Sequence, residues 1–135
     1  MPTLTLSLLP QTFAVCRLAP DAPLGVPGGA LSSVTRTADE LSVVCEEHLA
    51  PAGARAEGGW AALKLHGPFA FTLTGILAAV LNPLRGADVG IFAISTFDTD
   101  YVLVKREKLD AALRALRAAG HTILGDAVVD AAERE

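Results

Sequence analysis

The order of apolar segments in the second half of the chain limits its fold more than any other feature. Residues 60–66 alternate apolar and polar side chains, as a half-buried strand does, whereas residues 76–84 follow helical spacing. The full set of predicted segments in chain order is strand 60–66, helix 76–84, strand 89–95, strand 101–105, helix 108–119 and strand 122–124.

This alternation of strands and helices predicts an α+β fold of the ferredoxin-like type. Such a chain closes into one four-stranded antiparallel sheet with both helices on one face. The run 89–95 is almost continuously apolar, so we expect a strand that is covered on both faces. Thr74 is a candidate cap for the first helix, which we expect to end at Pro83 or Gly86, and Gly120 ends the second helix.

The first half repeats this pattern in a weaker form. Strands are predicted over 3–9, 13–18, 30–36 and 41–45, and a loop rich in proline and glycine stands where the first helix would be. Thr37 and Glu40 have the spacing of a capping box, which predicts a very short helix. We therefore expect two ferredoxin-like units in tandem, a degenerate one over 1–59 and a regular one over 60–125. Residues 51–59 connect them, residues 126–135 form a tail, and exchange of a terminal strand between the units is open.

Charge and cysteine content exclude several classes of function. The net charge is −4, from 11 basic and 15 acidic residues, and the basic side chains after residue 104 are interrupted by Glu107 and Asp110. Nucleic-acid binding, which needs a clustered basic face, is therefore not expected. Cys16 and Cys45 lie in apolar runs and are predicted to be reduced core thiols, and the three histidines lack the spacing of zinc ligands.

No segment of the sequence indicates export or membrane insertion. The first apolar run lacks a preceding basic region, and the longest helix-like apolar stretch is short and is interrupted by Asn82 and Pro83. We expect a cytoplasmic protein without a membrane partner.

The segment with the most functional information is VGIFAISTFDTDYVLVK, residues 89–105. By itself it is consistent with a hairpin in which Asp98, Thr99 and Asp100 satisfy the backbone of their own turn. However, GPFAFTLTGILAAVL followed by IFAISTFDTDYVLVK and a helix resembles tandem ACT proteins, the group of the aspartate kinase regulatory regions and the CASTOR arginine sensors of animals. SVTRTADELSVVC and LRAAGH are similar to the same group, and the resemblance covers residues 3–125.

The resemblance implies a regulatory module that binds an amino acid and catalyses nothing itself. In ACT modules the ligand lies where the first strand turns into the first helix, which corresponds here to Leu73, Thr74, Gly75 and Ile76. An independent physical reason supports this position, since the free amides at a helix start attract a carboxylate and glycine lets a ligand approach the backbone.

The family also implies a second wall for the site. By position, its backbone and acidic contacts correspond to Thr96, Phe97 and Asp100, of which Asp100 is suited to pair with an ammonium group. A neighbouring ACT unit completes the site with residues that correspond to Val89, Gly90 and Ile91 of its own central strand. We therefore expect a homodimer with symmetric contacts, an amino acid or related small carboxylate as ligand, a regulated enzyme on a separate chain, and no cofactor or metal.

Two alternatives remain for the function. A phosphatase of the haloacid dehalogenase type uses an Asp-x-Asp loop, in which Asp98 would be the nucleophile and Asp100 the acid/base, both holding Mg²⁺. The short chain that follows and the early return of the next strand argue against it. The other alternative is a module that dimerises through its edge strands and binds no ligand.

Overall fold

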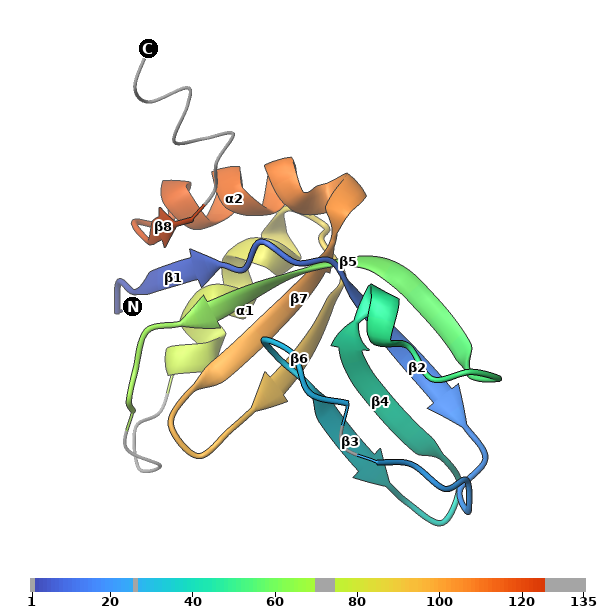
Figure 1. The fold of residues 1–135 in the computed structure, drawn as a ribbon. Coiled ribbons are helices and arrows are strands. Elements are labelled where there is room, and N and C mark those ends of the chain that lie inside the picture. Colours follow the sequence, from blue (N-terminus) through green and yellow to red (C-terminus); the bar gives the residue numbers. More distant parts are fainter. Residues whose placement is uncertain (1, 26, 70–74, 126–135) are drawn as a thin grey trace. The chain divides into compact units, whose positions relative to one another are not determined.

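The computed structural model describes residues 2–25, 27–69 and 75–125, and they form a mixed α+β fold (Figure 1). Contacts divide the chain into an N-terminal unit, residues 11–60, and a C-terminal unit, residues 1–10 with 61–135. The elements are β1 Thr5–Leu8, β2 Phe13–Leu18, β3 Ser33–Arg36, β4 Leu41–Glu46, β5 Arg55–Leu65, α1 Ile76–Gly86, β6 Ile91–Ser95, β7 Asp100–Lys105, α2 Leu109–Ala118 and β8 Thr122–Leu124, with short 3₁₀ turns η1 Glu47–Leu49 and η2 Arg106–Lys108.

The predicted order of strands and helices in the second half is confirmed, since β5, α1, β6, β7, α2 and β8 follow one another. The predicted four-stranded antiparallel sheet is wrong, because β1 from the start of the chain lies between β5 and β8. Leu6 of β1 is paired with Leu65 of antiparallel β5 and with Ile123 of parallel β8. The strand order of this unit is therefore β8-β1-β5-β7-β6, and β1, which we had grouped with the first half, belongs to the second.

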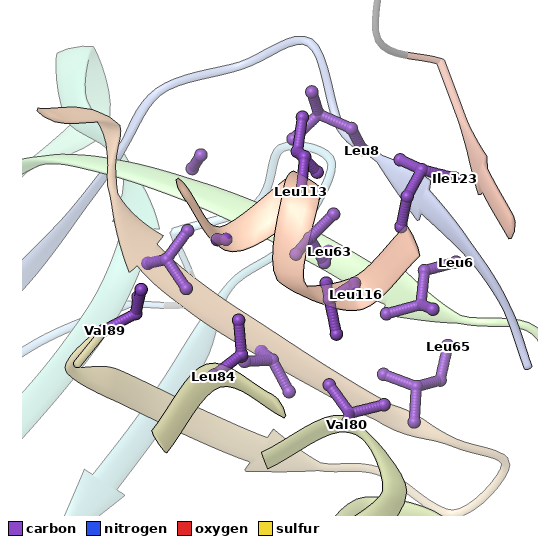
Figure 2. Packing of buried hydrophobic residues seen from close by; sticks show 14 residues of the cluster. Leu6, Leu8, Leu63, Leu65, Val80, Leu84, Val89, Leu113, Leu116 and Ile123 are labelled. Carbon is purple, nitrogen blue, oxygen red and sulfur yellow. The ribbon is translucent and has the colours of Figure 1, made fainter. Parts of the chain in front are cut away.

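One apolar cluster holds the C-terminal unit together. The register of the strands puts their alternate apolar residues on one face, and α1 and α2 pack their own apolar stripes against it (Figure 2). The labelled members of the cluster are Leu6, Leu8, Leu63, Leu65, Val80, Leu84, Val89, Leu113, Leu116 and Ile123. The inserted strand β1 thus extends the buried face of the sheet.

A glycine with positive φ precedes α1, and another follows α2. Gly75 precedes α1 in a left-handed conformation with φ 80°, and α1 continues through Pro83 to Gly86. The predicted cap Thr74 lies outside the described residues. Gly120 follows α2 with φ 95°, and its N–H donates to the carbonyl of Arg117 at 2.9 Å, which confirms it as the stop signal.

The N-terminal unit is built from strands, in the order β3-β4-β2-β5, and contains no α-helix among its described residues. The short helix predicted after Thr37 is wrong. The hydroxyl of Thr37 accepts the N–H groups of Asp39 and Glu40, both at 3.1 Å, and the N–H of Thr37 donates to the carbonyl of Glu40 at 2.9 Å. The same side-chain chemistry that caps a helix closes a tight turn here, because β4 begins at the next residue.

Two further expectations about strands need correction. β5 already begins at Arg55, so residues 55–59 of the connector predicted over 51–59 are strand. β6 was expected to be covered on both faces, but exposed and half-buried residues alternate along it, and Ile91 is 37% exposed. The apolar run gave no information on coverage, because burial depends on which elements reach the edge of the sheet.

Candidate functional site

An open hollow of about 270 Å³ lies between the start of α1 and the turn that joins β6 to β7. All the described residues around it belong to the C-terminal unit. They are Phe69, Gly75, Ile76, Leu77, Ala78, Ser95, Thr96, Phe97, Asp98, Thr99 and Asp100.

The first turn of α1 forms one wall of the hollow. The N–H groups at a helix start have no carbonyl partner within the helix and carry partial positive charge, and Ile76, Leu77 and Ala78 supply these groups here. Gly75 begins the turn with a positive φ, and a Cβ placed there would meet nothing within 4 Å. The backbone conformation, and not crowding, therefore favours glycine at this position.

The β6–β7 turn also lines the hollow, and hydrogen bonds within the turn stabilise it. The N–H of Thr96 donates to the carbonyl of Thr99 at 2.8 Å, and the N–H of Thr99 donates to the hydroxyl of Thr96 at 3.2 Å. The hydroxyl of Thr99, which is buried, donates to the carbonyl of Leu65 on β5 at 2.7 Å. The wall is thus attached to the central part of the sheet.

The charged residues that line the hollow are acidic. Asp98 and Asp100 both line it, and its described lining contains no lysine, arginine or histidine. The hydroxyl of Ser95 donates to Oδ1 of Asp100 at 2.5 Å, across the last pair of the β6–β7 ladder. The backbone carbonyl of Asp98 accepts the N–H of Phe69 at 2.9 Å. The lining therefore combines a helix start, which carries partial positive charge, with two aspartates.

The structure brings five of the residues named from the sequence to this hollow, namely Gly75, Ile76, Thr96, Phe97 and Asp100. Leu73 and Thr74 lie outside the described residues. Val89, Gly90 and Ile91 are not among the lining residues but lie where the chain enters β6. Val89 is buried, and its N–H donates to the carbonyl of Leu84 at 2.9 Å.

Sequence reasoning missed several lining residues. Leu77 and Ala78 belong to the same first helical turn as Ile76, so helix geometry alone would have added them. Ser95, by contrast, was expected in the same wall as Thr96 and Phe97, and it lines the hollow. No sequence pattern around Phe69 indicated that it would line the hollow. Its backbone N–H donates to the carbonyl of Asp98, a contact between residues distant in sequence.

The arrangement of the two aspartates does not match an Asp-x-Asp phosphatase. β6 and β7 are antiparallel neighbours that the turn joins directly, whereas that loop opens a crossover connection. In the parts of the chain that the structure describes, no three His, Cys, Asp or Glu residues gather as metal ligands would. None of the helices in those parts has the length and apolar character needed to cross a bilayer.

Comparison with known proteins identifies two regions. Residues 55–118 match the ACT domain family, and residues 11–52 match a family of N-terminal domains. The crystal structure of protein Atu0741 from Agrobacterium tumefaciens has 38% sequence identity to this chain and a TM-score of 0.86. The match covers 93% of this chain and 96% of the Agrobacterium protein.

More distant structures share the fold. A Vibrio cholerae protein of unknown function, described as a possible transport protein, has 20% identity and a TM-score of 0.66, covering 87% of this chain and 90% of that one. The regulatory subunit of aspartate kinase from Thermus flavus has 14% identity and a TM-score of 0.61, covering 87% and 99%. The chain therefore belongs to the family of the Agrobacterium protein and carries an ACT domain over residues 55–118.

Proposed function

We propose that this chain is a regulatory ACT module that binds a free amino acid or a related small carboxylate and has no catalytic activity of its own. The observation that carries the proposal is the hollow that the first turn of α1 and the β6–β7 turn line together. The fold shared with a regulatory subunit of aspartate kinase supports a regulatory role. The cytoplasmic location stays a prediction from the sequence.

The chemistry of the two walls matches the two charged groups of an amino acid. The carboxylate would lie against the amides of Ile76, Leu77 and Ala78, where the helix dipole favours negative charge. The ammonium group would pair with Asp100, and Asp98 adds negative charge to the same rim. A volume of about 270 Å³ suits a ligand of this size.

A second copy of the chain is proposed to complete the site. β6 pairs with β7 and with no other described strand, which makes it an edge strand, the kind of element through which sheets of two chains can associate. Val89, Gly90 and Ile91, at the start of this strand, are the residues through which a symmetric partner would contribute.

Thermal shift measurements with the twenty L-amino acids test the proposal, because a ligand that binds only the native state raises its stability. We expect one chemical class to stabilise the protein, and its decarboxylated and deaminated analogues to lose the effect. No stabilisation by any amino acid, together with a stable dimer in light scattering, would instead support the interaction module.

Replacing Asp100 with asparagine tests the acidic wall. We expect Asp100→Asn to weaken binding of the stabilising amino acid about tenfold, since a charge-assisted hydrogen bond is replaced by a neutral one. Isothermal titration calorimetry measures the change. Asp21→Asn makes the same change of charge at an exposed position of the N-terminal unit and is the matched control. Equal affinities for the two variants would remove Asp100 from the site.

A further inference from the structure

The β6–β7 hairpin carries three hydroxyl side chains beside the hollow, and their hydrogen bonds differ in kind. The hydroxyl of Thr96 donates to the carbonyl of Thr99 at 3.0 Å, and the hydroxyl of Thr99 donates to the carbonyl of Leu65. Both of these hydroxyls bind backbone groups. The hydroxyl of Ser95 instead donates at 2.5 Å to Oδ1 of Asp100, the carboxylate proposed to pair with an ammonium group. Ser95 is therefore the hydroxyl of the hairpin that acts on a side chain of the site.

The register of the hairpin determines which face of the sheet carries this pair. Ser95 and Asp100 are the last cross-strand pair of β6 and β7, so their side chains lie on the same face. Alternate residues of a strand share a face, and Val102 and Val104 of β7 belong to the apolar cluster that also contains residues of both helices. Asp100 therefore continues the helix-covered face of β7 to the hollow that the start of α1 lines.

The hydrogen bond from Ser95 limits the orientations open to the Asp100 carboxylate. Asp100 is half-buried, and a side chain at such a position keeps rotamer freedom unless a partner fixes it. With Oδ1 engaged by Ser95, Oδ2 retains its capacity to accept a hydrogen bond from a ligand. Hydrogen bonds to an ionised group are also stronger than neutral ones. The carboxylate is therefore held in place before a ligand arrives, which lowers the ordering cost of binding.

Asp98 offers a contrast within the same lining. Its backbone carbonyl accepts the N–H of Phe69 at 2.9 Å, and its side chain is exposed. The hydroxyl of Ser95 donates to Asp100 and not to Asp98. The two aspartates therefore carry the same charged group beside the same hollow but differ in their contact with Ser95.

The start of α1, which supplies the other part of the lining, is held by partners outside the hairpin. The N–H of Ala79 donates to the carbonyl of Gly75 at 3.0 Å. The carbonyl of Ala79 lies opposite Pro83, which has no N–H to donate, and Nε2 of the buried His121 lies 2.8 Å from it. Nδ1 of the same ring accepts the N–H of Leu4 at 3.0 Å. A substitution in the hairpin removes none of these hydrogen bonds.

We propose that Ser95 is a positioning residue of the site, whose hydroxyl holds the Asp100 carboxylate in the orientation that pairs with the ammonium group of a bound amino acid. The inference rests on the proposed function, because it assigns a role within the same site. Without the hydroxyl, the carboxylate rotates more freely, and binding then includes the free-energy cost of ordering it. Affinity therefore falls although the amides at the start of α1 stay in place.

The experiment measures how ligand affinity depends on the Ser95 hydroxyl. The probe is an equimolar mixture of the twenty L-amino acids, added to the full chain, and its stabilising effect in thermal unfolding gives an apparent affinity. We expect Ser95→Ala to weaken this affinity about fivefold, the effect of losing one hydrogen bond. Ser95→Thr keeps a hydroxyl at the same position and should keep an affinity close to that of the wild type. Ser95 is exposed, and unfolding without the probe verifies that each variant folds.

Double variants show whether Ser95 acts through Asp100. In Asp100→Ala the carboxylate that Ser95 holds is absent, so adding Ser95→Ala should change the affinity by less than about twofold, the scatter expected for additive effects. In Asp98→Asn that carboxylate is still present, so adding Ser95→Ala should again weaken the affinity about fivefold. Ser33→Ala, on β3 of the N-terminal unit, is the matched serine control and should keep the wild-type affinity.

The outcomes distinguish the two proposals. If the mixture does not stabilise the wild type, the proposed function fails and the role of Ser95 fails with it. If the mixture binds the wild type and Ser95→Ala equally well, only the role of Ser95 is overturned. A loss of affinity that is as large in the Asp100→Ala background as in the wild type would also overturn it, because Ser95 would then support the hairpin and not the carboxylate. An equal loss in Ser95→Thr and Ser95→Ala would overturn it as well, since the hydroxyl would then have no effect.

Discussion

The two units of the chain reach stability by different means. In the C-terminal unit two helices cover one face of a sheet, and the cluster between them is rich in leucine and valine. In the N-terminal unit, one smaller cluster is formed by Ala14, Cys16, Leu41, Val43 and Cys45. A helix start offers several unpaired amides at one point, and both described α-helices lie in the unit that holds the candidate site.

Charged side chains of the N-terminal unit form hydrogen bonds to the backbone of its long loop. The guanidinium of Arg36 donates to the carbonyls of Pro20 and Ala22 and so ties down the loop rich in proline and glycine. Oε2 of Glu46, a buried residue, accepts the N–H of Ala30 at 2.7 Å on the other side of that loop. A loop without regular structure needs such partners because its backbone groups have no ladder to join.

Truncation of a core leucine should separate the two units most clearly. Leu116 is fully buried in the large cluster, so Leu116→Ala should lower the free energy of unfolding by about 4 kcal/mol, whereas Leu41→Ala in the smaller cluster should cost about 2 kcal/mol. Urea denaturation measures both. Leu124→Ala, at a position 45% exposed, is the control and should change stability by less than about 0.5 kcal/mol. Equal costs in the two clusters would break the comparison.

Glycine substitutions should show how the loop of the N-terminal unit is held. Gly29 has φ 83°, and a Cβ there would overlap Oε2 of Glu46, whereas Gly28 has φ 76° and open space around it. We expect Gly29→Ala to cost about 2 kcal/mol and Gly28→Ala about 1 kcal/mol, the difference being the displaced Glu46 carboxylate. Gly25→Ala, with neither constraint, should be close to neutral. Thermal denaturation that ranks Gly28→Ala as the more harmful change would contradict this account of the loop.

The buried thiols should lower the stability of the N-terminal unit at alkaline pH. Burial, and next the nearby Cys16, raise the pKa of Cys45 from 9.0 to about 11, and burial also raises the pKa of Cys16. Above about pH 9 the unfolded chain loses these protons while the folded chain keeps them, so stability falls as pH rises. We expect a loss of about 1 kcal/mol between about pH 8 and about pH 9.5. In the double variant Cys16→Ala/Cys45→Ala this loss of stability should disappear. If stability falls with pH as steeply in the double variant as in the wild type, other groups cause the loss.

Local patterns predicted the individual elements well. β2 and β8 have the predicted bounds, and α1, β7 and α2 begin within one residue of them. The turn between β6 and β7 was also visible, since polar residues separate two apolar runs. Periodicity is a local property, and these elements are set by residues close in sequence.

The predictions that were wrong depend on contacts that a local sequence pattern does not record. The Thr37 motif predicted a helix because its local bonding is the same in a turn, and only the early start of β4 decides between them. The exposure of Ile91 depends on which elements cover the faces of β6, and these elements are distant in sequence. Pro83 was a candidate helix end, but the donor from His121 lets α1 continue.

The sequence by itself determined the order of strands and helices, the acidic turn and the glycine at the start of α1, because each depends on neighbouring residues. Only the tertiary structure decided that β1 enters the sheet between β5 and β8, that the first turn of α1 and the β6–β7 turn enclose one hollow, and that His121 joins α1 to β1. These are contacts between segments tens of residues apart. They are selected by the packing of a shared core and by the need of buried backbone groups for partners, which no local pattern records.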